Sequence, residues 1–291
     1  MVESGSSVPR RQLGRQLRQA HEEAGITLEA AVQELEWSRA KMYRIEGGQA
    51  PMRKHDVLAM CTFYRTPSET TTALVGLAAQ SKVPGWWHAY ADTVSPEFIP
   101  YLGLEPTAAH IRHYALAFIP GLLQTPEYAT AVIRSRRGIT EAELEQAVAV
   151  RMRRQRVLTR RIPQPPKLEV VLEEGVLRRM IPGRAAMQRQ LAHLINNAQV
   201  TGVRVRVLPF ASSAQGAVAG SFILMDFSAA GTRPPEPSIV YLEGQTGALY
   251  LDRPQEIAAH ERTWETLSEQ ALGEQESEDL IAKVIGEMDD A

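Results

Sequence analysis

Apolar residues recur at helical spacing through the first eighty residues of the chain. The first helix presents one apolar face, formed at positions i, i+4, i+7 and i+11 by Leu13, Leu17, Ala20 and Ala24. Gly25 follows this face, at a place where a helix that stops favours glycine in the left-handed conformation. We predict consecutive helices, five in all, within residues 8–80, and they make up the first domain, residues 1–80.

The second and third of these helices are short and close together in the sequence. Thr27 and Ser38 are residue types that cap helix N-termini, and Gly47-Gly48 follows the third helix at the point where it stops. The second helix is expected to end near Leu35, so that only about three residues join the pair. Two capped helices with so short a turn are typical of a helix-turn-helix, whose second helix enters the DNA major groove.

A second domain is predicted over residues 86–291. Residues 81–85 are interpreted as a linker, because Pro84-Gly85 breaks the helical pattern. The first part of the second domain, residues 86–161, is expected to be helical, with helices over 106–117, 125–136 and 140–161.

The pattern changes after the prolines at positions 163, 165 and 166. Short runs rich in Val, Ile, Leu and aromatic residues, bounded by Gly, Pro or Ser, are typical of strands. Such runs are predicted as strands of the sheet-containing part, residues 168–291: 168–172, 203–209, 221–227, 238–243 and 248–251. Further helices are expected around 184–198, 255–272 and 278–288. The fold class is therefore α+β, a five-helix bundle with the helix-turn-helix followed by a mixed α/β domain whose small sheet is flanked by helices.

The composition is that of a globular protein, with 44% apolar and 23% charged residues. The net charge of -2 shows no overall basic excess, so any binding of nucleic acid must be local. The single cysteine, Cys61, excludes a disulfide within the chain, fits a reducing compartment and is expected in the core. Residues 1–9 lack the order of a secretion signal and the most apolar stretch, 114–123, is too short to span a membrane, so we expect a cytoplasmic protein.

The third helix presents hydrogen-bond donors once its apolar residues turn inward. With Met42 and Ile45 in the core, Arg39, Ala40 and Tyr43 lie on one exposed side. Arginine bonds guanine through two hydrogen bonds and alanine touches the thymine methyl group. These three residues are therefore predicted to contact bases.

Cations beside that face are predicted to contact phosphate, which positions a protein on DNA without reading its sequence. They are Lys41, Arg44 and Arg53. Together with the helix cap and the base-contacting residues, the predicted DNA-binding set is Ser38, Arg39, Ala40, Lys41, Tyr43, Arg44 and Arg53.

The first domain resembles the XRE family, the helix-turn-helix domains of Cro and phage repressors. The resemblance covers about residues 10–66 and rests on Ala24-Gly25-Ile26-Thr27, Trp37-Ser38-Arg39 and Tyr43-Arg44-Ile45-Glu46-x-Gly48. The family usually has a phosphate-holding glutamine where Leu28 stands, and a left-handed glycine where Glu36 stands. The resemblance therefore implies operator binding with one phosphate contact fewer, and a turn that costs about 1 kcal/mol in strain.

The rest of the chain resembles a domain of unknown function that follows this module in actinomycete regulators of the WhiJ type. The resemblance rests on three motifs: Ile119-Pro120-Gly121-Leu122-Leu123-Gln124-Thr125, Val207-Leu208-Pro209-Phe210 and Tyr241-Leu242-Glu243-Gly244. Such regulators are often encoded beside a small partner protein and are implicated in the control of development and antibiotic production. The resemblance implies two partners, DNA and a small protein encoded next door.

Aromatic residues gather at the start of the second domain, where eight of the eighteen lie between 86 and 128. Seven of them are candidates for a ligand pocket: Trp86, Trp87, Tyr90, Phe98, Tyr101, Tyr114 and Phe118. Two interpretations stay open. The residues join the helical part to the sheet as core, or they line an apolar pocket for a small effector.

Charge is concentrated in two further places. Six arginines lie within eleven residues that contain no acid, namely Arg151, Arg153, Arg154, Arg156, Arg160 and Arg161, whereas residues 252–291 hold three basic and twelve acidic residues. The arginines form a solvated or tail-paired helix face, or they make a second contact with the DNA backbone. Salt dependence would separate the two interpretations.

Neither a metal site nor a catalytic site is predicted. His110 and His113 lie three apart on a predicted helix, but no third ligand lies near them in the sequence. The nucleophile-elbow, zinc-helix and phosphate-loop motifs do not occur, so we expect neither an enzyme nor a cofactor.

The sequence thus predicts a DNA-binding transcriptional regulator with sequence specificity. A homodimer would place two recognition helices about 34 Å apart on a palindromic operator. The second domain would sense a small ligand or a partner protein. The alternative is an antitoxin-like interaction module that captures the product of a neighbouring gene through its acidic tail.

Overall fold

The described part of the chain forms two compact units. The computed structural model describes residues 7–48, 50, 52–80, 94, 95, 97–161, 163–198, 202–212, 220–228, 236–244 and 247–289. The first unit contains the described residues within 1–91 and 98–107, and the second contains those within 92–97 and 108–291. The predicted linker at 81–85 lies outside the described residues, so the predicted domain boundary stays a prediction.

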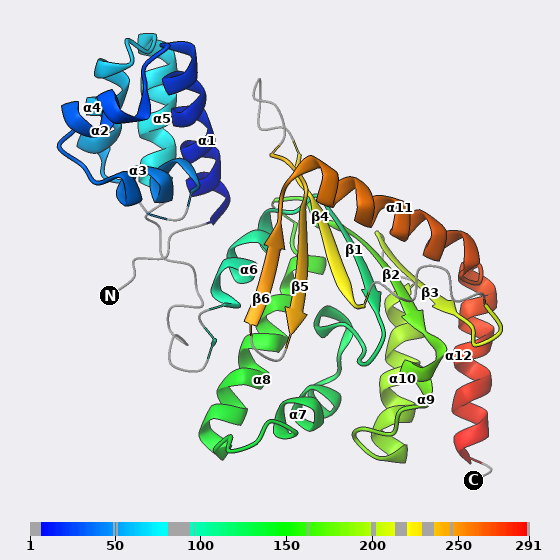
Figure 1. Cartoon of the computed structure of the whole chain (residues 1–291). Coiled ribbons are helices and arrows are strands. Elements are labelled where there is room, and N and C mark those ends of the chain that lie inside the picture. The colour runs from blue at the N-terminus through cyan, green and yellow to red at the C-terminus, as the bar shows by residue number, and fades with distance from the viewer. Residues whose placement is uncertain are drawn as a thin grey trace. The chain divides into compact units, whose positions relative to one another are not determined.

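The first unit is a bundle of five helices, as predicted, followed by a short helical segment. The five helices are α1 (Ser7–Glu23), α2 (Leu28–Glu34), α3 (Arg39–Glu46), α4 (Lys54–Phe63) and α5 (Ser68–Gln80) (Figure 1). Residues 98–107 add α6 (Ile99–Leu104) and a 3-10 turn, Glu105–Thr107. The helices α1, α3, α4 and α5 all contribute to the core of the bundle, with Leu13, Leu17, Met42, Met60 and Leu74. Cys61 is buried among them, as expected.

The turns of the helix-turn-helix follow the sequence signals. The hydroxyl of Thr27 accepts a hydrogen bond from the amide of Ala30, which caps α2. Gly25, after α1, has a φ of 63°. Glu36, between α2 and α3, has a φ of 53°, in the left-handed region that favours glycine. The strained turn that the family resemblance implied is therefore present.

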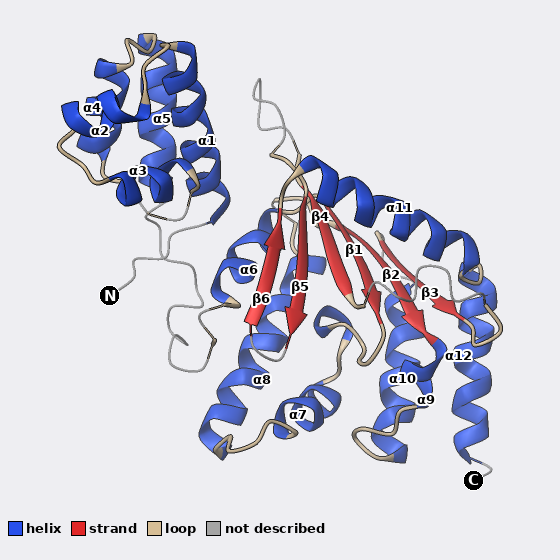
Figure 2. Cartoon of the chain, in the orientation of Figure 1, coloured by secondary structure: helices blue, strands red, loops and turns tan. Residues whose placement is uncertain are grey.

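The second unit is built on a six-stranded mixed sheet. Its strands are β1 (His110–Ala115), β2 (Lys167–Glu173), β3 (Val203–Leu208), β4 (Phe222–Asp226), β5 (Ile239–Gly244) and β6 (Gly247–Leu251). The strand order is β3-β2-β1-β4-β5-β6, in which β1, β2 and β3 run parallel and the other pairs are antiparallel (Figure 2). All five predicted strands are confirmed.

The predicted helix over 106–117 is wrong, because the strand β1 occupies its middle, His110–Ala115. This strand pairs with β2 on one edge and β4 on the other, so its backbone hydrogen bonds are made across the sheet. Each of its faces mixes polar and apolar residues: Arg112 and Tyr114 share one, Ile111 and His113 the other. The sequence of β1 therefore lacks the alternation of polar and apolar residues that indicates a strand. It follows that His110 and His113 point to opposite faces and cannot share a ligand.

Helices cover both faces of the sheet. The helices of this unit are α7 (Pro126–Arg134), α8 (Glu141–Gln155), α9 (Glu174–Arg178), α10 (Arg184–Ala198), α11 (Pro254–Gln270) and α12 (Glu274–Asp289). Figure 1 shows α11 on one side of the sheet and α7, α8 and α10 on the other. Trp264 and Leu267 of α11 pack in one core cluster with Tyr114, Phe222 and Val240 of the sheet. The cluster is apolar and buried, so it anchors α11.

Two helices differ from the prediction. The long helix expected to reach 161 ends at Gln155 and continues as a 3-10 turn, Arg156–Leu158. The short α9 was not predicted, since five residues are too few to show a helical period. Among the described residues, no helix combines the length and the apolar character needed to cross a membrane.

Candidate nucleic-acid interface

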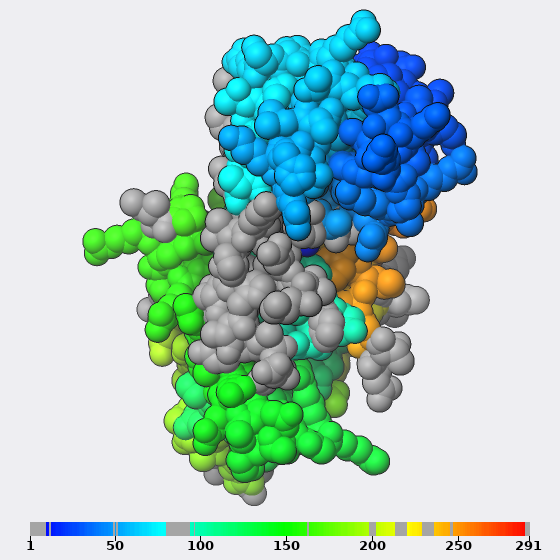
Figure 3. Space-filling model, turned by 90° about the vertical axis from the view of Figure 1, so that its left-hand side faces the viewer, coloured from blue at the N-terminus to red at the C-terminus, as the bar shows by residue number. Residues whose placement is uncertain are grey.

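The recognition helix α3 is placed by its cap and by two buried residues. The hydroxyl of Ser38 accepts a hydrogen bond from the amide of Lys41 at 3.2 Å. Met42 and Ile45 are buried in the bundle core, 0% and 3% exposed. The opposite face of α3 therefore points outward, as predicted. The space-filling view shows the bundle, in blue and cyan, closed on its core (Figure 3).

Close backbone contact fixes the far end of α3 against α1. A Cβ atom on Gly14 of α1 would lie 2.5 Å from the carbonyl oxygen of Ile45. Gly48, after α3, has a φ of 65°, and its Cβ would lie 2.5 Å from the Cα of Arg11. Because no side chain fits at either position, glycine at both allows α1 and α3 to touch through their backbones.

A buried polar pair also ties α3 to α1. Nδ1 of His21 lies 2.9 Å from Oε1 of Glu46, and both side chains are 9% exposed. The His21 ring stacks on Tyr64 of α4 at 5.4 Å between centroids, and burial raises the pKa of that phenol. His21 is thus a partner of Glu46, while Arg18 pairs with Glu22 on its own helix. Helix α1 and the end of α4 thus hold the recognition helix at its C-terminal end.

The exposed face of α3 carries the predicted DNA-binding side chains. Arg39, Ala40, Tyr43 and Arg44 are exposed, and the Tyr43 ring is 63% exposed. Ser38 is exposed at the cap position. Arg53 is exposed at the N-terminus of α4. The structure contains no DNA, so the individual contacts stay predictions.

Two neighbours that the sequence analysis did not single out hold cations of this face. Nη2 of Arg39 lies 2.9 Å from Oε1 of Glu29 in α2. Nζ of Lys41 lies 3.6 Å from the centre of the Trp37 ring, a cation–π contact. Both pairs restrict long side chains before DNA arrives, which lowers the entropy cost of ordering them. The contact of Trp37 with Lys41 could have been predicted from their four-residue spacing. The contact of Glu29 with Arg39 could not, because the turn between α2 and α3 brings the two residues together.

Part of the arginine run holds a loop in place rather than standing in solvent. The loop at 119–125 includes a 3-10 turn, Gly121–Leu123, and its Gln124 side chain donates to the carbonyl of Ile119 at 2.6 Å. Nη1 of Arg151 donates to Oε1 of Gln124 at 2.7 Å, and Gln155 donates to the Gln124 carbonyl at 2.7 Å. Arg151 is therefore structural, and neither interpretation drawn from the sequence describes it.

The same loop is bonded from α10. Oε1 of Gln190 accepts from the amide of Thr125 at 2.6 Å, and its Nε2 donates to the carbonyl of Leu123 at 2.8 Å. Gln190 is fully buried. Side chains of two helices, α8 and α10, thus hold this loop through hydrogen bonds. This explains why the motif at 119–125 is specific enough to carry a resemblance.

Comparison with known families identifies both units. Residues 12–74 match a helix-turn-helix domain, and residues 98–283 match a domain of unknown function, DUF5753. The chain belongs to the DUF5753 family. Its order, a helix-turn-helix followed by this domain, is the order that the sequence resemblance predicted, and the helix-turn-helix supports a DNA-binding regulator. Searches of curated proteins and of solved structures find no match.

The structure describes four of the seven aromatic residues proposed as a pocket. Trp86, Trp87 and Tyr90 lie outside the described residues. Phe98 and Tyr101 stack on each other at 5.1 Å in the first unit.

The other two aromatic candidates lie in the second unit. Tyr114 lies in the core beneath α11, where its hydroxyl donates to Glu173 at 2.6 Å, and Phe118 is 45% exposed. Tyr114 therefore serves the core, which is one of the two interpretations left open, and an aromatic pocket stays a prediction.

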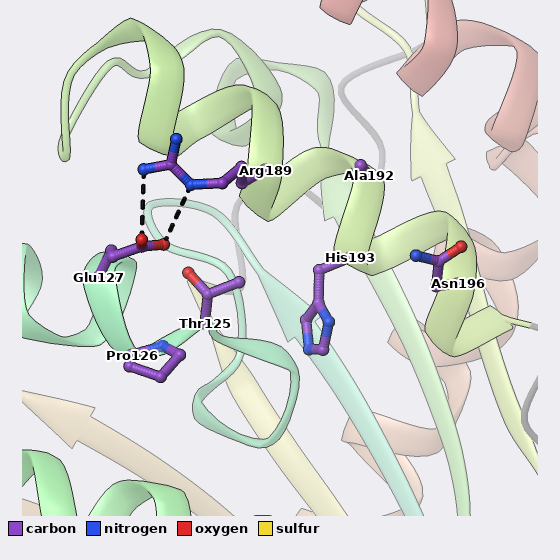
Figure 4. Close-up of a pocket in the computed structure, with 7 residues that line it drawn as sticks. All are labelled: Thr125, Pro126, Glu127, Arg189, Ala192, His193 and Asn196. Atoms are coloured by element: carbon purple, nitrogen blue, oxygen red, sulfur yellow. Dashed lines mark hydrogen bonds and ion pairs between the residues drawn. The ribbon is translucent and has the colours of Figure 1, made fainter.

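A pocket that the structure does describe in the DUF5753 domain lies between α7 and α10. It has a volume of about 420 Å³ and is lined by Thr125, Pro126, Glu127, Arg189, Ala192, His193 and Asn196 (Figure 4). Glu127 and Arg189 pair across its rim at 3.2 Å, and burial lowers the pKa of His193. Its lining combines polar side chains with apolar surface and contains none of the predicted aromatic residues.

Proposed function

We propose that this protein is an XRE-type transcriptional regulator of the cytoplasm that binds a palindromic operator as a homodimer. The observation that carries the proposal is α3: a capped helix, fixed by α1 and α4, with four of the residues predicted to contact DNA exposed on the side away from the core. Arg39 and Tyr43 would reach base edges, and Lys41, Arg44 and Arg53 would contact phosphate. The proposed role is binding without catalysis.

The test is a fluorescence-anisotropy titration of the full-length protein with two DNA duplexes. One carries the sequence upstream of the gene that encodes this protein, and the other carries a scrambled sequence. Arg39→Ala should lower the ratio of specific to non-specific affinity, by about 1–3 kcal/mol. Arg44→Ala should weaken binding to both duplexes by the same factor. It should also reduce the slope of log affinity against log salt concentration by about one. The matched control is Arg262→Ala, an exposed arginine of α11, which should change neither. Equal affinity of the wild-type protein for both duplexes would refute sequence-specific binding.

We further propose that the DUF5753 domain transmits a signal to the helix-turn-helix, from a small ligand or from a small protein encoded next door. The acidic C-terminal segment favours the protein partner as a second candidate function, close to an antitoxin-like module. Glu265 and Glu269 of α11 and Asp279 of α12 are exposed, while Ile281 and Val284 of α12 are buried.

Because α12 contributes to the core, removing the tail would unfold the unit rather than test its charge. The informative variant replaces Glu265, Glu269 and Asp279 by glutamine or asparagine. If less of the neighbouring gene product copurifies with this variant, and its circular dichroism is unchanged, the result supports capture by the acidic surface. If the same amount copurifies, the acidic surface does not bind the partner.

A further inference from the structure

The two helices that form the pocket, α7 and α10, are tied together by two polar contacts. At the rim, Nη2 of Arg189 lies 3.2 Å from Oε1 of Glu127, and Nε of Arg189 donates to the other carboxylate oxygen at 3.4 Å (Figure 4). At the start of α7, the side chain of Gln190 accepts a hydrogen bond from the amide of Thr125 at 2.6 Å. The helices are therefore held at a fixed spacing without a ligand, so the pocket is preformed, and a molecule that enters it need not order its walls.

One face of α10 forms a wall of the pocket. Arg189, His193 and Asn196 follow one another at spacings of four and three residues, so they lie on the same side of the helix. Figure 4 shows the His193 side chain leaving α10 toward Thr125 and Pro126, at the start of α7. The pocket thus lies between this face of α10 and the first turn of α7.

Two polar side chains of this wall have no partner in the described part of the chain. His193 and Asn196 make no side-chain hydrogen bond or ion pair there, whereas Asn197, the next residue, donates to the carbonyl of His193 at 2.9 Å. Burial lowers the pKa of His193 below 6.5, so its ring is neutral at pH 7, with one N–H and one bare nitrogen. The Asn196 amide also offers both a donor and an acceptor. Together they can bond a group that donates and accepts on one edge.

The lining presents no unpaired charge to a ligand. Glu127 and Arg189 neutralise each other at the rim, and the other described residues of the lining are uncharged at pH 7. An ion that entered would lose hydration without meeting an opposite charge, which is unfavourable. Pro126 and Ala192 add apolar surface. An uncharged molecule with an apolar body and one hydrogen-bonding edge fits this lining best.

We propose that the pocket between α7 and α10 binds a small uncharged amide, whose apolar part lies against Pro126 and Ala192 and whose carbonyl and N–H groups bond His193 and Asn196. An amide presents an acceptor and a donor side by side, which matches the neutral imidazole and the Asn196 side chain. The volume of about 420 Å³ lies within the range of small-molecule sites, about 300–1,000 Å³. The inference deepens the proposed sensing role of the DUF5753 domain and rests on it.

The test uses three probes of the same shape that differ in charge: benzamide is uncharged, benzoate is an anion and benzamidine is a cation. NMR of full-length protein labelled at histidine follows the His193 ring, and the His193→Gln spectrum identifies its signal. Benzamide should shift this signal in a saturable manner, with a Kd of about 1 mM or below, and both ions should bind at least about tenfold more weakly. A signal that benzamide does not move overturns the proposal. So does one that either ion moves at less than about ten times the benzamide concentration.

A bulky side chain in the pocket tests its place in the fold. Ala192→Phe should abolish the benzamide shift by filling the pocket, and the residue is exposed, so the core stays intact. The matched control is Ala185→Phe, an exposed alanine of α10 outside the lining, which should bind benzamide as the wild type does. Thermal unfolding shows that each variant is folded. Equal benzamide binding by the two variants overturns the proposal.

A second pair of variants tests the hydrogen bond from Asn196. Asn196→Ala should weaken benzamide about threefold to tenfold, as expected for the loss of one hydrogen bond between neutral groups. Asn197→Ala makes the same change at a residue whose amide bonds within its own helix and does not line the pocket, so the affinity should stay the same. Equal affinities in the two variants overturn the proposed contact.

Anisotropy with the upstream duplex and saturating benzamide separates the site from its sensing role. Benzamide binding with a changed DNA affinity supports both. Benzamide binding with an unchanged DNA affinity supports the site and overturns its sensing role. Loss of the site would leave the DNA-binding proposal standing, because the titration of the two duplexes without benzamide tests that proposal separately.

Discussion

The neutral His113 makes the stability of the DUF5753 domain fall as the solution becomes acidic. Its pKa is about 3 in the folded protein, because burial and the charge of Arg154 disfavour the imidazolium, against an ordinary value near 6.5 in an unfolded chain. Below pH 6.5 the unfolded chain therefore binds a proton that the folded protein does not. Stability is lost as pH falls from 6.5 toward 3.

The size of this loss follows from the two pKa values. At pH 5 the unfolded imidazole is mostly charged and the folded one is neutral, which corresponds to about 2 kcal/mol between pH 7 and pH 5 at 1.36 kcal/mol per pKa unit. His113 is only partly buried as a residue, so this figure is an upper value. The perturbation that isolates it is His113→Gln, which keeps a polar side chain and removes the titration.

The assay is urea denaturation of both proteins at pH 7, 6 and 5, followed by circular dichroism. All other titrating groups are shared, so the wild type should lose up to about 2 kcal/mol more than His113→Gln between pH 7 and pH 5. The urea concentrations at the unfolding midpoints of the two proteins should diverge as the pH falls. The slopes of unfolding free energy against urea concentration should stay similar. Parallel losses in the two proteins would show that His113 titrates normally in the fold, and would refute the burial argument.

Three further predictions concern local geometry. Glu36→Gly should stabilise the first unit by about 0.5–1 kcal/mol, because relief of the left-handed backbone exceeds the extra entropy of an unfolded glycine; an unchanged or lower melting temperature would contradict this. Gly14→Ala should destabilise it by about 1–3 kcal/mol and weaken operator binding, since the new methyl group collides with the carbonyl of Ile45, and normal DNA affinity in anisotropy would count against the close contact. Gln190→Leu should cost the second unit about 2–4 kcal/mol in urea denaturation, because the amide of Thr125 and a carbonyl lose their buried partner; a loss below about 1 kcal/mol would show that the loop is not held by this side chain.

The sequence determined features that depend on near neighbours. A capping hydroxyl such as that of Ser38 acts three residues away, and the left-handed backbone of Gly25 and Glu36 is a property of single positions. Strands whose two faces differ can be predicted from alternating polar and apolar residues. An example is β3, where buried Val205 follows exposed Arg204. The helix-turn-helix and five of the six strands were predictable for this reason.

Only the tertiary structure decided which distant groups meet. His113 stands on a strand rather than a helix because pairing on both edges outweighs a local pattern in which neither face of β1 is wholly apolar. Glu46 meets His21, and Arg39 meets Glu29, because packing brings separate helices within 3 Å, at distances that no spacing in the sequence encodes. Local rules thus placed the recognition helix, while long-range packing placed its supports and brought His113 into the sheet.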